Sequence, residues 1–213
     1  MRAVALLVIF GLCHDLSAGS FDVTVKDGKG ALVADAVVYA KGNGMTAQST
    51  KKQTVIDQQD KQFIPYVTAV QVGTSILFPN KDNIRHHVYS LSSAKKFELP
   101  LYKGVPAESV VFDKKGFVTL GCNIHDWMIA YVAVLGTPHF QVTGREGHAL
   151  LKNLPPGQYT VEVWQPSLKG APATFAQHVD VAAGGMKQLL FTLDLKPGFR
   201  VKRAAGFSTG GYR

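Results

Sequence analysis

A cysteine, a histidine and a methionine follow one another at intervals of three residues in this 213-residue chain. They are Cys122, His125 and Met128, and the segments on either side, residues 117–120 and 129–135, are apolar. A tight loop between two paired strands would point the three side chains toward one centre. Thiolate, imidazole and thioether are the soft ligands of copper electron-transfer sites, in which the axial sulfur is weak. The spacing therefore indicates a copper site that still lacks one imidazole.

The missing imidazole is available upstream, in the polar segment at residues 79–89. This segment contains His86 and His87 directly before an apolar strand pattern. Because neighbouring residues of a strand point to opposite faces, only one of the two can reach the metal. Zinc fits the set less well, since thioether is a poor zinc ligand. The other histidines of the expected mature chain are isolated in sequence, and we expect them on the surface or in the core: His139, His148 and His178.

The first residues have the character of a secretory signal peptide. A basic residue, Arg2, precedes a mostly apolar run at residues 3–12, and the small residue Ala18 suits a cleavage site. The run is too short to cross a bilayer, which takes about 20 residues on a helix. We therefore expect residues 1–18 to be removed, and the mature chain to be periplasmic, without an integral membrane segment.

Cysteine usage supports a role for the thiol. Of the two cysteines, Cys13 would leave with the signal peptide, so that Cys122 would be unpaired in an oxidising compartment. The alternative is a small, buried and inert cysteine, which is common. The neighbouring His125 and Met128 favour the ligand.

Length and charge bound the architecture. The mature chain would have about 195 residues, enough for two domains. The net charge of +8 comes largely from residues 196–213, which hold five basic residues and no acid and are rich in Gly and Ser. We expect this segment to be a basic, disordered tail, and we expect no nucleic-acid partner for an exported protein.

Short segments rich in β-branched and aromatic residues alternate with turn signals such as Asp27-Gly28 and Pro156-Gly157. This pattern predicts an all-β protein of the sandwich or barrel type. Residues 50–61 are polar, and we expect a loop or a single helical piece there. The expected strands are residues 21–25, 36–40, 67–72, 75–79, 87–91, 109–112, 116–120, 129–135 and 158–164.

The order of these motifs resembles the cupredoxin family. Residues 63–65, residues 70–80, a His-x-Val and then Cys-x2-His-x2-Met occur in the order typical of that family. The ligand loop is most similar to that of amicyanin, and the whole chain resembles the cupredoxin-like proteins associated with methylamine utilisation. The resemblance covers about residues 21–136 and implies a Greek-key cupredoxin β-sandwich.

The resemblance also implies one type 1 (blue) copper ion. Its equatorial ligands would be His86, Cys122 and His125, and its axial ligand would be Met128. The His-x-Val pattern of the family falls on His86, and His87 is the alternative ligand. Axial ligation and the surroundings of the sulfur tune the redox potential of such sites.

By the same resemblance, the protein would be a one-electron carrier and not an enzyme. The electron would leave through the edge of His125 beside Trp127, Asn80 would steady the site, and the partners would be a periplasmic dehydrogenase or a c-type cytochrome. Two alternatives stay open: copper delivery or storage without redox turnover, and a non-catalytic interaction module. The sequence has no His-x-His pair of the kind that multicopper enzymes use.

A second, smaller β-sandwich is expected at residues 137–195. Its Leu154-Pro155-Pro156-Gly157 segment and the strands around it are similar to carboxypeptidase regulatory-like domains. Residues 23–39 resemble the first strands of that same domain. The copper domain is therefore placed at residues 19–136, with the alternative that strands from residues 20–42 join the second sandwich.

Overall fold

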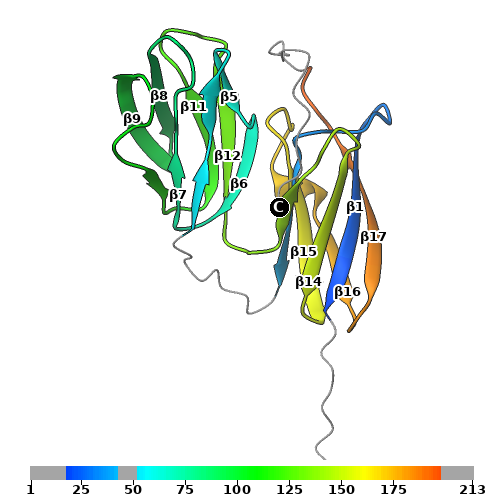
Figure 1. Ribbon diagram of the computed structural model, residues 1–213. Coiled ribbons are helices and arrows are strands. Elements are labelled where there is room, and N and C mark those ends of the chain that lie inside the picture. Colours follow the sequence, from blue (N-terminus) through cyan, green and yellow to red (C-terminus); the bar gives the residue numbers. More distant parts are fainter. Residues whose placement is uncertain (1–17, 43–51, 198–213) are drawn as a thin grey trace, which may run out of the picture.

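The computed structural model describes residues 18–42 and 52–197, and these form two β-sandwiches that lie side by side (Figure 1). The all-β fold expected from the sequence is confirmed. Within the described ranges the helical structure is limited to one 3-10 turn, η1 (Pro172–Phe175), and no helix there has the length and apolar character of a membrane span. The predicted signal peptide, apart from Ala18, and the predicted tail from residue 198 onward lie outside the described residues.

The first sandwich, which we call the metal-side sandwich, encloses a core between two sheets. Ile76 and Phe112 from the smaller sheet pack with Val118 and Val132 from the larger one. A short hairpin, β4 (Asp57–Gln59) and β5 (Gln62–Ile64), lies beside them. The larger sheet has the order β6 (Val67–Gln71), β12 (Ile129–Leu135), β11 (Gly116–Gly121), β8 (His86–Ser92), β9 (Lys95–Tyr102). The smaller sheet has the order β10 (Val110–Phe112), β7 (Thr74–Leu77), β3 (Gln53–Val55).

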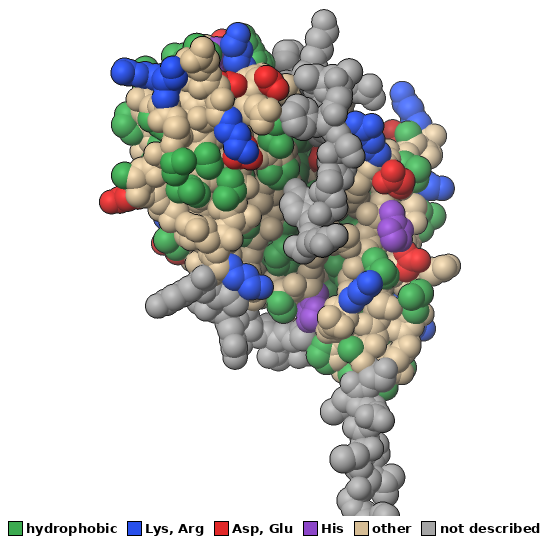
Figure 2. Space-filling view, in the orientation of Figure 1, with side chains coloured by type: hydrophobic (Ala, Val, Ile, Leu, Met, Phe, Trp, Pro, Cys, Tyr) green, Lys and Arg blue, Asp and Glu red, His purple; other side chains and the backbone are tan. Residues whose placement is uncertain are grey.

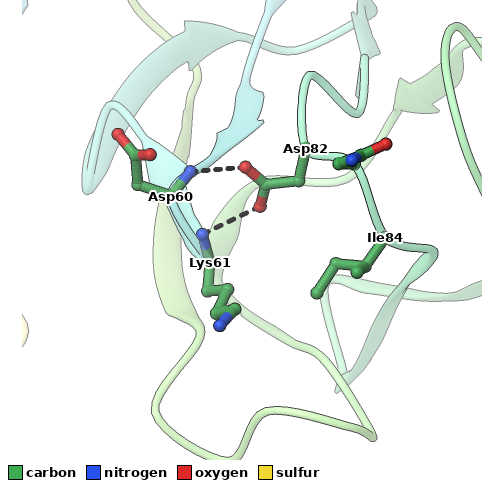
Figure 3. A pocket seen from close by; sticks show the side chains of 5 residues that line it. Asp60, Lys61, Asp82 and Ile84 are labelled. Carbon is green, nitrogen blue, oxygen red and sulfur yellow. Dashed lines mark hydrogen bonds between the residues drawn. The ribbon is translucent and has the colours of Figure 1, made fainter.

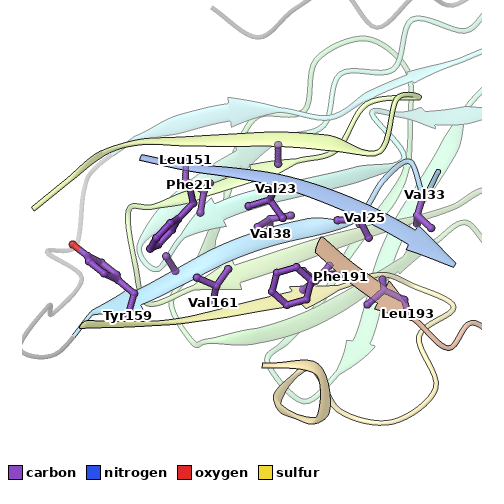
Figure 4. Close-up of a cluster of buried hydrophobic side chains, with 14 of the residues drawn as sticks. Phe21, Val23, Val25, Val33, Val38, Leu151, Tyr159, Val161, Phe191 and Leu193 are labelled. Atoms are coloured by element: carbon purple, nitrogen blue, oxygen red, sulfur yellow. The ribbon is translucent and has the colours of Figure 1, made fainter. Parts of the chain in front are cut away.

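The second sandwich is built from both ends of the chain. Its first strand alternates in burial as a half-buried strand should, and Phe21, Val23 and Val25 point into a core that contains Leu151 and Phe191 (Figure 4). One sheet has the order β14 (His148–Leu154), β1 (Gly19–Asp27), β17 (Met186–Leu193). The other has the order β13 (Phe140–Val142), β2 (Val37–Gly42), β15 (Gly157–Trp164), β16 (Gln177–Val181).

A copper domain at residues 19–136 would require the two N-terminal strands to lie in the metal-side sandwich. They lie in the second sandwich instead. The structure has the alternative arrangement, in which β1 pairs with β14 and β17, and β2 pairs with β13 and β15. The physical reason is the apolar face of β1, which is buried only against the strands of the second sandwich. The metal-side sandwich spans residues 53–135 and is inserted between β2 and β13.

The expectation of a loop or helical piece at residues 50–61 is wrong for the part that the structure describes. Residues 53–55 and 57–59 form β3 and β4, although their sequence is polar. β3 is held by parallel pairing with β7, and β4 by antiparallel pairing with β5. Tertiary pairing thus overrides a weak local preference.

The two sandwiches are joined by an apolar contact. Strand β12 is buried on both faces, because alternate residues turn toward the metal-side core and toward a third cluster that includes Val37 and Tyr39 of β2. At this contact the rings of Phe117 and Trp164 stack with centroids 4.3 Å apart and planes 7° from parallel. The face in Figure 2 shows basic, acidic and apolar side chains interspersed over both sandwiches.

Candidate metal centre

The sequence motif lies at one end of three neighbouring strands. Cys122 directly follows β11, Met128 directly precedes β12, and these strands pair antiparallel with Gly121 opposite Ile129. His86 is the first residue of β8, which pairs with β11 on its other side. The strand order β12-β11-β8 therefore brings two segments that are distant in sequence to the same end of these three strands.

Three of the four expected ligands form one compact group. One potential ligand atom from each of His86, Cys122 and His125 lies within 4.8 Å of the others, and the imidazole centroids are 5.0 Å apart. His86 is fully buried, Cys122 is 4% exposed, and His125 is partly exposed. The group is therefore shielded from water except at His125.

The protonation chemistry of the two imidazoles suits a metal. The Nδ1 atoms of His86 and His125 are buried without a hydrogen-bond partner in the structure. A buried polar atom without a partner is costly, and native proteins seldom keep one without a reason. Burial, aided by the charges of His86 and Lys61 and opposed by Asp82, lowers the pKa of His125. A lowered pKa favours the neutral imidazole, the form that binds metals.

His87 is not part of this group. Its Nε2 atom lies 2.8 Å from a carboxylate oxygen of Glu98 on β9, and its ring lies against Tyr89, with centroids 5.4 Å apart. His86 and His87 are both buried, so burial alone does not separate them. Their side chains separate because adjacent strand residues point in opposite directions.

Met128 is 1% exposed and packs in the same core cluster as Cys122. Its backbone N–H donates to the carbonyl of His125 at 2.8 Å, which tightens the ligand loop into a turn. The side chain is therefore buried in the metal-side core, at the end of the loop that carries Cys122 and His125.

Polar contacts of Asn80 and Asp82 fix the loop before His86. The Nδ2 group of Asn80 donates to the carbonyls of Ile84 and Tyr102, at 2.9 and 2.8 Å, and its Oδ1 accepts from the N–H of Asp82 at 3.0 Å. Asn80 thus steadies the loop that delivers His86. Asp82 in turn contacts the Nε2 atom of His86 at 2.7 Å. The four-residue spacing between Asp82 and His86 is the only sequence signal for that contact.

A second set of buried contacts lies at the core cluster that contains Cys122. Tyr102 donates to the carbonyl of Phe78, and Gln58 Nε2 donates to the Tyr102 hydroxyl at 2.6 Å. Burial raises the pKa of Tyr102 to about 12, although the Gln58 hydrogen bond opposes the rise. The tyrosine is therefore a neutral hydroxyl.

An exposed aromatic ring lies against the partly exposed histidine, and two further large apolar side chains of the ligand segments are exposed. The Trp127 ring meets His125 edge to face, with centroids 5.1 Å apart, and is 48% exposed. Ile124 is 48% exposed and Ile84 is 40% exposed. An open pocket of about 350 Å³ lies next to Ile84, lined also by Asp60, Lys61, Asp82 and Asn83 (Figure 3).

Fold and site together define a class: an all-β protein of two sandwiches with a His-Cys-His group in one of them, of which His86 and Cys122 are buried. No family model matches the sequence, and no curated protein matches it. The solved structures that resemble part of the chain include a copper-containing nitrite reductase, a purple cupredoxin and variants of amicyanin.

A copper-containing nitrite reductase from Thermus scotoductus SA-01 is 20% identical, with a TM-score of 0.38, over 45% of this chain and 25% of the reductase chain. A purple cupredoxin from Nitrosopumilus maritimus is 22% identical, with a TM-score of 0.34, over 39% of this chain and 99% of its own. A reduced amicyanin variant is 21% identical, with a TM-score of 0.36, over 46% of this chain and 99% of its own. The interpretation of the metal centre therefore depends on the side chains of this chain.

Proposed function

We propose that the protein binds one copper ion of type 1 and carries single electrons between redox partners. The observation that supports this most directly is the pair of buried, unpartnered Nδ1 atoms of His86 and His125 beside the thiol of Cys122. Two imidazoles, a thiolate and a thioether are a ligand set typical of blue copper. A zinc site would show more Cys or His and no thioether.

Each side chain has a defined part in this proposal. His86, Cys122 and His125 would hold the ion in the equatorial positions, and Met128 would be the weak axial ligand. The bound copper would supply a one-electron couple between Cu(II) and Cu(I). Because these residues come from strand ends and a seven-residue loop closed by paired strands, they would be held in similar positions in both oxidation states.

The route for the electron follows from exposure. His125 is the only one of the three grouped ligands that is not buried, and it contacts the half-exposed Trp127. A partner that docks over Trp127 would lie against the ring that contacts His125. We propose a periplasmic dehydrogenase or a c-type cytochrome as that partner, a periplasmic location, and no catalytic activity of the chain itself.

The visible spectrum tests the proposal. Cu(II) added to the purified mature protein should give an intense blue band at a stoichiometry of one, because a short copper–thiolate bond gives such a charge transfer. Cys122→Ser should remove the band. His148→Ala, which changes an exposed histidine in the other sandwich, is the matched control and should keep it.

Either of two results would contradict the carrier function. Copper held without the thiolate band would favour delivery or storage. Failure of the wild-type protein to bind copper at all would leave a non-catalytic interaction module.

A further inference from the structure

A single carboxylate joins the predicted ligand His86 to a separate hairpin. Asp82 Oδ2 lies 2.7 Å from His86 Nε2 and accepts from the backbone N–H of Lys61 at 2.8 Å. Asp82 Oδ1 accepts from the backbone N–H of Asp60 at 2.6 Å (Figure 3). One side chain thus meets three donors from two segments that are distant in sequence.

These contacts determine which nitrogen of His86 carries a proton. Both side-chain oxygens of Asp82 accept from backbone N–H groups, Oδ1 from Asp60 and Oδ2 from Lys61, as an acceptor-only carboxylate does. His86 Nε2 then donates to Oδ2, which leaves the lone pair of the neutral ring on Nδ1, the buried atom without a partner in the structure.

The hairpin turn is shaped for this contact. Asp60 and Lys61 are the two residues between β4 and β5, and their φ angles are 54° and 56°. Two successive residues with positive φ define the turn that suits a two-residue hairpin, although residues other than glycine adopt it reluctantly. Both N–H groups of the turn bond to Asp82, which compensates for that unfavourable backbone.

The carboxylate itself is held from the other side. Its own backbone N–H donates to the Oδ1 atom of Asn80, and Asn80 is anchored to the carbonyls of Ile84 and Tyr102. Asp82 is partly buried, with 13% of its side chain exposed. It is therefore a fixed acceptor and not a mobile surface charge.

We propose that Asp82 is a positioning residue for the metal centre. It fixes the tautomer and the orientation of His86, ties the β4–β5 hairpin over the site, and places a negative charge beside a ligand. A carboxylate behind a ligand histidine makes the imidazole a better donor, which favours Cu(II) over Cu(I). The part that concerns copper depends on the proposed function, whereas the tautomer and the hairpin contact do not.

The metal-free protein gives the first test. Nitrogen-15 NMR of the full mature chain should show His86 protonated at Nε2, and the amides of Asp60 and Lys61 should exchange slowly with solvent. Asp82→Asn should speed exchange at both amides. A His86 that is protonated at Nδ1 in the wild-type protein would refute the proposal, whether or not any variant folds.

The copper-loaded protein gives the second test. Asp82→Asn should weaken Cu(II) binding by about 10 to 100-fold and raise the reduction potential. The matched control is Asp60→Asn, which removes one negative charge from the same pocket but keeps the backbone N–H that bonds to Asp82. Asparagine also tolerates a positive φ.

The control should leave the affinity and the potential near their wild-type values. Equal changes in the two variants would overturn the proposal, because they would show a general effect of charge. A wild-type protein that binds no copper would refute the proposed function alone, and the tautomer measurement would still decide the role of Asp82.

Discussion

Replacing His86 and His87 by alanine, one at a time, tests which of the two histidines is the copper ligand. Both side chains are buried, and both have an unpartnered Nδ1 atom. They differ in their surroundings, because His86 lies in the group with Cys122 and His125, whereas His87 faces Glu98 and Tyr89. Only His86→Ala should therefore remove a copper ligand.

The expected magnitude follows from mass action. Copper that binds only the folded state at about 100 times its dissociation constant should raise the free energy of unfolding by about 2.7 kcal/mol. His87→Ala should retain this increment within about 0.5 kcal/mol, and His86→Ala should lose nearly all of it.

Equilibrium urea unfolding measures the increment. Each protein is unfolded without metal and with Cu(I) buffered by a competing chelator under anaerobic conditions, and the two free energies are subtracted. The subtraction cancels any loss of packing that the substitution causes by itself. If His87→Ala lost the increment and His86→Ala kept it, the assignment of His86 from its place beside Cys122 and His125 would be wrong.

Two further predictions concern the second sandwich and its contact with the first. Trp164→Ala should lower the free energy of unfolding by roughly 2 kcal/mol, less than the 3 to 5 kcal/mol of a fully buried aromatic, because Trp164 is only partly buried. Urea unfolding measures this loss of stability. The blue band should persist in the variant, because the Trp164 ring stacks on Phe117 in the contact cluster and not in the core around Cys122. A lost band would contradict the separation of the two clusters. Burial lowers the pKa of His139 below 6.5, against the effect of a hydrogen bond with the backbone of Lys152, so the folded protein prefers the neutral ring. The contribution of His139 to the free energy of unfolding should be complete above pH 6.5 and lost as the pH falls through the lower folded-state pKa. His139→Gln should therefore reduce the difference between the free energies of unfolding measured above pH 6.5 and below the folded-state pKa. An unchanged difference would refute the effect.

Local sequence determined the strands that have strong apolar patterns and the loop that lies between two of them. Residues 129–135 form β12 with the predicted bounds, and Cys122 and Met128 stand at the two ends of the loop before it. The reason is that spacing within one short loop between paired strands leaves little freedom for where its ends go. Two of the grouped side chains, Cys122 and His125, were therefore predictable from one segment.

Tertiary structure decided the features that depend on distant segments. The sequence left His86 and His87 as alternatives, because alternation says that they diverge but not which one faces Cys122. The β4–β5 hairpin and its contact with Asp82 escaped prediction, since polar residues with positive φ have no strong pattern of their own. The pairing of β1 with β17 joins the two ends of the described chain, and only the burial of the apolar face of β1 against that distant strand selects it.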